Sequence, residues 1–172
     1  MTELTHRERL QPSLLDRLTD DEPDLKQESR NKRVLSPSRL RDCVKRDLIW
    51  LFNATSIVSL EPEVATLPHV KSSVINYGLP DFTGHTASSV DVPALERLLR
   101  EAILAFEPRL LKDSVRVKLD IDAEEMTHNS MTFSIEGELW AQPLPLRLFL
   151  RTEIDLETGE VAISERSGSG RA

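Results

Sequence analysis

The stretch AILAFEPRLLKDSVRVKLDI, residues 102–121, contains the point at which the sequence changes from a helical to a strand pattern. Apolar residues recur at helical spacing before Pro108. After it, Val115, Val117 and Leu119 alternate with charged or polar residues. Because proline cannot continue a helix and stiffens the chain, we expect a sharp join between a helix and a sheet at Pro108.

Two long helices are predicted before this join. Ser36 and Asp91 are residues that cap helices, and a proline suited to the first turn follows each. We therefore expect helices near residues 37–53 and 92–106, with apolar stripes facing the core. The stripes consist of Leu40, Val44, Leu48, Leu51 and Phe52 in the first helix, and Leu95, Leu98, Leu99, Ala102 and Phe106 in the second.

Alternation continues after the join and predicts strands near residues 114–122, 130–140, 145–155 and 160–165. Consecutive strands with short connections imply an antiparallel β-meander with one face covered by helices, so the predicted fold class is α+β. The alternating residues of the last three strands are Met131, Phe133, Ile135 and Leu139, then Leu144, Leu146, Leu148, Leu150, Thr152 and Ile154, then Val161 and Ile163.

The N-terminal region, residues 1–35, is predicted to be a mobile segment outside the main domain. Leu14, Leu15 and Leu18 share one face of a short helical pattern, and the charged stretch 19–33 has too few apolar residues to fold alone. The three leucines can dock on the chain's own core or on a partner. We assign residues 36–166 to the α+β domain and 167–172 to a flexible tail.

Composition excludes several classes of function. The chain of 172 residues has a formal charge of -7, which argues against nucleic-acid binding because phosphate neutralisation needs a basic face. No apolar run is long enough to enter a membrane or act as a signal peptide, and Cys43 has no cysteine partner. We expect Cys43 to be a buried thiol and the protein to be cytoplasmic.

Neither a metal nor a cofactor is expected. None of the four histidines stands at ligand spacing from another, and no glycine-rich phosphate-binding motif is present. Ser72 and Ser73 lie near His69, but adjacent serines in a turn-rich stretch usually bond to the local backbone.

Glu107 and Arg109 stand on either side of Pro108 and allow three interpretations. Glycoside hydrolysis needs a second carboxylate, for which Asp120, Asp122, Glu124 and Glu125 are candidates. A nearby arginine, however, lowers a carboxyl pKa, which is the wrong direction for a general acid. An outward clasp for another protein and an internal tie between helix and sheet both remain open.

Five stretches stand in an order that resembles the TssE family, the baseplate subunits of type VI secretion systems. They are SLLDRL (13–18), RDLIWLFNA (46–54), SVINYGLPDFTG (73–84), FEPRL (106–110) and RTEIDLETGEV (151–161). This family is similar to the wedge proteins of contractile phage baseplates and was once labelled lysozyme-like.

The resemblance implies a structural, cytoplasmic wedge subunit without lysozyme activity. Its implied partners are the wedge proteins TssF, TssG and TssK and the sheath subunits TssB and TssC, whose first ring would attach by strand exchange. Glu107, Pro108 and Arg109 match the family's assembly motif, and we expect Arg109 to pair outward with a partner. The alternatives are a peptidoglycan hydrolase and a wedge protein of another contractile particle, such as a phage tail.

Overall fold

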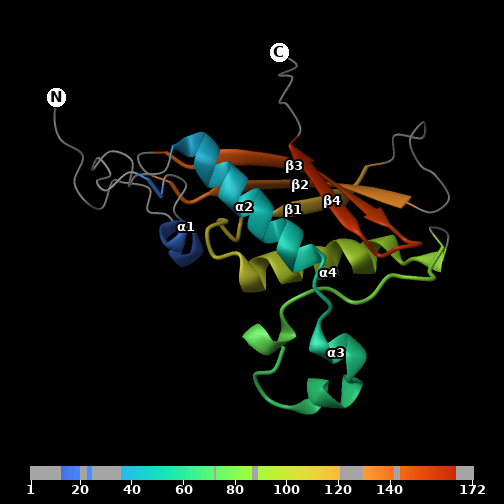
Figure 1. The fold of residues 1–172 in the computed structure, drawn as a ribbon. Helices are drawn as coiled ribbons and strands as arrows, with labels where there is room; N and C mark the ends of the chain where they lie inside the picture. The colour runs from blue at the N-terminus through green and yellow to red at the C-terminus, as the bar shows by residue number, and fades with distance from the viewer. Residues whose placement is uncertain are drawn as a thin grey trace, which may run out of the picture.

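Figure 1 shows a four-stranded sheet with two long helices packed against it. The computed structural model describes residues 13–19, 23–24, 36–71, 73–86, 89–120, 130–141 and 144–165. The helices are α1 (Leu14–Leu18), α2 (Pro37–Phe52), α3 (Ile57–Leu60) and α4 (Val92–Phe106), with 3-10 turns η2 (Pro62–Thr66) and η3 (Val74–Asn76). The strands are β1 (Arg116–Leu119), β2 (Ser130–Leu139), β3 (Leu146–Asp155) and β4 (Val161–Glu165). The predicted α+β fold with an antiparallel meander is confirmed.

Both long helices begin at the predicted caps. The Ser36 hydroxyl accepts the backbone N–H of Arg39 at 3.2 Å, and the Asp91 carboxylate accepts that of Ala94 at 3.1 Å. A proline occupies the first turn of each helix. Short-range signals in the sequence therefore fix where α2 and α4 start.

The strands follow one another in the sheet, in the order β1-β2-β3-β4, and every neighbouring pair is antiparallel. Phe133 lies opposite Thr152, and Ile154 lies opposite Val161, so the alternating residues share the face that the helices cover. Strand β1 begins two residues later than predicted, because Ser114 lies in a turn and its hydroxyl donates to the carbonyl of Leu111. The predicted end of that strand lies outside the described residues.

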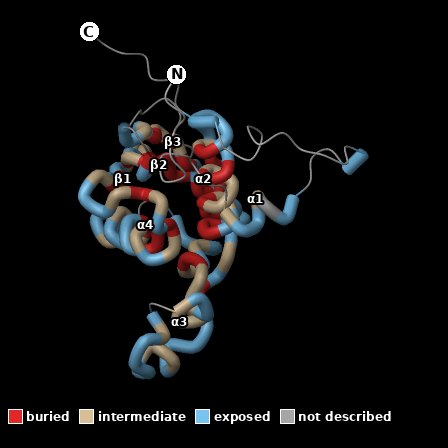
Figure 2. The backbone as a smooth tube through the Cα atoms, turned by 90° about the vertical axis from the view of Figure 1, so that its left-hand side faces the viewer, coloured by how far each residue is buried: buried red, intermediate tan, exposed pale blue. Residues whose placement is uncertain are grey.

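The core lies between the sheet and the two long helices (Figure 2). Most of the predicted stripe residues are buried, but Leu98 and Phe106 are half-buried, and Leu144 is exposed and outside the strand. Thr152 is fully buried among apolar side chains, and its hydroxyl oxygen has no hydrogen-bond partner among the described residues. Apart from Leu79, the largest fully buried side chains come from α2, α4 and the sheet, and include Leu48, Leu51, Leu99, Ile103, Phe133, Ile135, Leu148, Leu150 and Ile154.

Cys43 is a buried free thiol, as predicted. Burial raises the pKa of this thiol, with a further upward contribution from its hydrogen bond to Asp16, so the reactive thiolate is disfavoured. Within the described part of the chain, no helix combines the length and apolar character that a membrane crossing requires. The domain boundaries at 35 and 166 stay predictions, because residues 25–35 and 166–172 lie outside the described residues.

Candidate functional site

Glu107 and Arg109 contact each other at the end of α4. Glu107 caps the helix by donating its backbone N–H to the carbonyl of Ile103 at 2.8 Å, and it is only 4% exposed. The backbone N–H and the side-chain Nε of Arg109 donate to Glu107 Oε1 at 3.0 and 2.7 Å, and Arg109 Nη2 donates to Oε2. A single guanidinium therefore occupies both carboxylate oxygens, while Pro108 is exposed at the turn.

The contact extends into a series of ion pairs that crosses three helices. Arg109 Nη2 also pairs with Asp47 on α2, and Asp47 pairs with Arg46 at 2.7 Å. Arg46 Nη1 then pairs with Asp16 of α1 at 2.7 Å. We call these five side chains, which alternate in sign from Glu107 to Asp16, the charge chain.

Three members of the charge chain have shifted pKa values. Burial tends to lower the pKa of Arg46, but hydrogen bonds with Asp16 and Asp47 and the charges of these carboxylates raise it. Burial tends to raise the pKa of Asp16, but hydrogen bonds from Ser13, Arg46 and Cys43, together with the charge of Arg46, lower it to about 2. Burial tends to lower the pKa of Arg109, but Glu107 and Asp47 raise it above its usual value. Asp16 and Arg109 are therefore charged throughout the physiological pH range.

The structure brings two of the predicted site residues together and adds one that was not foreseen. Asp47 precedes Arg109 by 62 positions, so nothing local in the sequence reveals their contact. These contacts form an internal tie, but they join the end of α4 to α2 and not a helix to the sheet. Contact with a partner stays a prediction. Arg109 Nη1 is buried without a hydrogen-bond partner among the described residues, and an unpaired buried donor is costly.

The geometry of Glu107 does not favour acid catalysis. A general acid needs a proton to donate, but both Glu107 oxygens accept hydrogen bonds from a guanidinium that carries a permanent charge. Three of the proposed second carboxylates, those of Asp122, Glu124 and Glu125, lie outside the described residues.

Helix α1 packs with its polar side toward the domain. Ser13 and Asp16 form a capping box, and the Asp16 side chain reaches Arg46 on α2. The predicted binding residues face the other way: Leu14 is 71% exposed, Leu18 is 74% exposed, and Leu15 is also exposed. Their exposure leaves the alternative of docking in the chain's own core without support, and binding of a partner stays a prediction.

Both tryptophans of the chain are exposed beside the charge chain, and neither was among the predicted site residues. The Trp50 ring stacks on the guanidinium of Arg46, with 5.1 Å between the guanidinium carbon and the ring centroid. The backbone N–H of Trp140 donates to the carbonyl of Arg109 at 2.7 Å. One available signal was that Trp50 falls outside the apolar stripe of its helix. Tryptophan and arginine are common energetic anchors of protein interfaces.

Strand β1 forms one edge of the sheet, and side chains from α4 occupy both ends of that edge. Glu96 accepts the backbone N–H of Leu119 at 3.0 Å, and Arg100 Nε donates to the carbonyl of Val115 at 3.1 Å. Arg116 and Lys118 are exposed on the outer face of the same strand. Charged side chains and a covering helix are the usual protections against unwanted pairing at an edge.

Strand β4 forms the other edge. Among the described residues, hydrogen bonds reach the outward backbone groups of its first residue only. The side chain of Asn53, the C-cap of α2, accepts the Val161 N–H and donates to the Val161 carbonyl, both at 2.9 Å. Because backbone groups alternate in direction along a strand, those of Ile163 and Glu165 also point away from β3. No described residue bonds to them, and the outer face of the strand carries only Ala162 and Ser164 before Glu165.

Comparison with known proteins identifies the family. The family model of the baseplate wedge protein gp25 matches residues 38–144, which is more than half of the chain. This range contains α2 except its first residue, the whole segment to the end of β2, and the Glu107–Arg109 contact. Searches of curated proteins and of solved structures found no match. No group of three or more potential metal ligands occurs in the parts of the chain that the structure covers.

Proposed function

The chain belongs to the family of the baseplate wedge protein gp25, and from this premise we propose that it is a TssE-like subunit of a type VI secretion baseplate. Proteins of this family are structural and associate with other baseplate proteins. The proposed role is to join TssF, TssG and TssK in the wedge and to hold the first ring of TssB and TssC sheath subunits, in the cytoplasm. A wedge of a phage tail is the alternative within the same family.

The open edge of β4 carries the proposal of sheath attachment. Ile163 and Glu165 offer outward N–H and C=O groups in one uninterrupted row, next to small side chains. A strand from a sheath subunit can add to such a row through backbone hydrogen bonds. This mode of binding also explains why an edge of this kind is useful to the protein, since an unprotected edge otherwise favours aggregation.

Substitution of Ile163 tests sheath attachment. Ile163→Pro removes the outward N–H without breaking a bond to β3, because proline is tolerated at edge positions whose N–H faces away from the sheet. Ile163→Ala is the matched control, because it loses the same packing but keeps the N–H. Both should lower the free energy of unfolding by about 2 kcal/mol or more, yet only the proline variant should lose fluorescent sheaths in cells.

A further control separates this edge from the other one. Val117→Pro removes a comparably placed N–H from β1 and should leave the number of sheaths normal if the variant folds. Normal sheath numbers in folded Ile163→Pro would contradict attachment at β4. Clearing of purified peptidoglycan that depends on Glu107 would instead favour the hydrolase.

The wedge contacts are proposed to involve Leu14, Leu15 and Leu18 together with the turn at Glu107, Pro108 and Arg109. The exposure of the leucines and of Pro108 at the turn supports this proposal. Leu14→Ser with Leu18→Ser should reduce recruitment to the baseplate and change the unfolding free energy by less than about 0.5 kcal/mol, since both side chains are exposed. Recruitment is counted as fluorescent baseplate foci, and unchanged foci would count against the leucines.

Arg109 needs a different readout because it is tied internally. Arg109→Ala leaves Glu107 buried without its cation, which should cost about 3 kcal/mol. Arg109→Met combined with Glu107→Gln removes both charges and should restore much of that stability. If this double variant is folded but still fails to join the baseplate, Arg109 binds a partner. If the double variant joins the baseplate normally, Arg109 is an internal tie only.

A further inference from the structure

The segment between α2 and α4 forms a lobe, residues 54–79, that projects away from the sheet (Figure 1). It contains α3, η2 and η3, and none of the described residues in these three elements is buried. Figure 2 shows buried backbone only where the lobe joins the domain. The described residues of α3, η2 and η3 therefore form no hydrophobic core of their own.

The lobe is nevertheless held firmly at its base. The N–H of Leu79 donates to the carbonyl of Ala54 at 2.8 Å, and the N–H of Ser56 donates to the carbonyl of Leu79 at 2.9 Å. Gly78 has a φ of +130°, and a Cβ at this position would lie 2.3 Å from the Ala54 oxygen. This close approach requires glycine and fixes the two ends of the lobe side by side.

The backbone of the lobe is bonded internally and offers no open row of groups to a strand. Successive turns are closed by N–H donation from Val64 to Glu61, from Leu67 to Val64, and from Ser73 to Val70, at 3.0 to 3.1 Å. A partner must therefore recognise the lobe through side chains, unlike a strand that adds to β4.

Large apolar side chains project from the lobe into solvent. Four of them, within one short segment, are between 55% and 83% exposed, and exposed apolar side chains mark interaction sites where they lie together. They are Leu60, Leu67, Val74 and Ile75.

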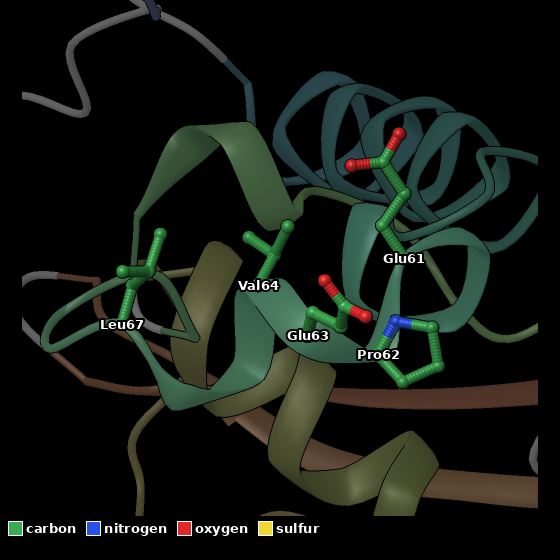
Figure 3. Close-up of a pocket in the computed structure, with 5 residues that line it drawn as sticks. All are labelled: Glu61, Pro62, Glu63, Val64 and Leu67. Carbon is green, nitrogen blue, oxygen red and sulfur yellow. The ribbon is translucent and has the colours of Figure 1, made fainter.

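A hollow in the lobe combines apolar and acidic groups (Figure 3). It is lined by Pro62, Val64 and Leu67, together with the side chains of Glu61 and Glu63. Neither carboxylate is paired with a cation among the residues that the structure describes. The chemistry of the hollow fits an apolar side chain accompanied by a lysine or arginine.

We propose that the lobe docks an amphipathic helix of another baseplate protein, with its apolar face on Leu60 and Leu67 and a lysine or arginine beside Glu61 and Glu63. A helix presents side chains and no free row of backbone groups, so it suits a surface that is recognised through side chains alone. A symmetric contact between the lobes of two copies is disfavoured, because it would bring the same two carboxylates into contact with like charges. The inference rests on the baseplate role but not on the edge of β4.

Site-specific photo-crosslinking in cells that contain the whole baseplate tests the partner. A photoreactive residue at Leu60 or Leu67 should crosslink to one helix of a baseplate protein, identified by mass spectrometry, that carries lysine or arginine beside an apolar stripe. Ala105, exposed on α4, is the control position and should not give this product. Crosslinks to a second copy, to sheath, or to an acidic segment would overturn the proposal, as would their absence.

Charge reversal then tests the recognition. Glu61→Lys with Glu63→Lys should weaken co-purification with the crosslinked protein at least about tenfold and leave the melting temperature unchanged, since both residues are exposed. Acidic replacements of the partner's basic residues should restore binding, while Glu157→Lys with Glu160→Lys is the control elsewhere. Unchanged co-purification would refute the acidic contact. Sheath loss in Ile163→Pro is measured separately, so the two proposals can fail independently.

Discussion

The two edges of the sheet have similar numbers of occupied backbone groups but differ in where these groups lie. On β1, the occupied groups are the carbonyl of Val115 and the N–H of Leu119, at opposite ends of the strand. On β4, both occupied groups belong to Val161, at the start of the strand. The first arrangement leaves a single outward residue, Val117, between two barriers, whereas the second leaves a row that continues from Ile163 to the end of the strand.

The comparison teaches that position protects an edge more than the number of hydrogen bonds does. A strand that approaches β1 meets side chains from α4 at both ends and the charges of Arg116 and Lys118 on one face. Among the described residues, a strand that approaches β4 meets one such barrier, Asn53, at the start of the strand. Side chains from α4 obstruct the β1 edge, whereas the β4 edge can be used by a partner that provides a complementary strand.

Opening the β1 edge should give the largest effect. Glu96→Ala with Arg100→Ala removes both barriers and should cost about 2 kcal/mol of unfolding free energy, because charged side chains lose bonds to the backbone. The outward backbone groups of β1 should then form hydrogen bonds with those of a second molecule. Light scattering of the purified protein should show self-association that the wild type lacks at the same concentration.

The double variant also needs a control for its lost charges. Glu101→Ala with Arg97→Ala changes the same residue types on exposed positions of the same helix. This control should stay monomeric. If the edge variant also stays monomeric, protection of β1 by α4 is wrong.

Removing Asn53 should have a smaller effect on the other edge. Asn53→Ala frees the N–H and carbonyl of Val161 and should cost about 1 kcal/mol, because water can solvate both groups. Urea unfolding measures this cost. Sheath assembly should persist because the open row becomes longer, and its loss would indicate that Asn53 itself contacts the partner.

Acidification should have the smallest effect on the β1 edge, and this effect should be reversible. The hydrogen bond from the Leu119 N–H, followed by the contact with Lys118, holds the pKa of Glu96 below its usual value. The contribution of the Glu96 carboxylate to stability is therefore present above the pKa of this group in the unfolded chain, about 4.3. This contribution disappears as the pH falls through the lower pKa of Glu96 in the folded protein. The amide of Leu119 should exchange faster in that range, while Glu96→Gln should show no such dependence.

The sequence allowed the fold to be predicted because its signals are local. Ser36, Asp91 and Pro108 mark helix ends within a few residues, and alternation marks the strands. The covered face follows from the same alternation, with Thr152 placed correctly beside the apolar residues. The order of the strands follows from their short connections.

The candidate site could be predicted only in part, because its contacts join distant segments. The proximity of Glu107 and Arg109 follows from their spacing, but their tie to Asp47 depends on how α2 crosses the end of α4. The closing of β1 by Glu96 and Arg100 depends on how α4 lies along the strand. Neither arrangement has a signature in local sequence, and both determine which surface is available to a partner.

Asn53 determines where on β4 an added strand can begin to pair. Because its side chain already uses the N–H and carbonyl of Val161, pairing must stop at Ile163, and the incoming chain cannot slide past that point. A shift by one residue would turn every side chain of the added strand to the opposite face of the sheet. The C-cap of α2 thus limits how far an added strand can extend along β4.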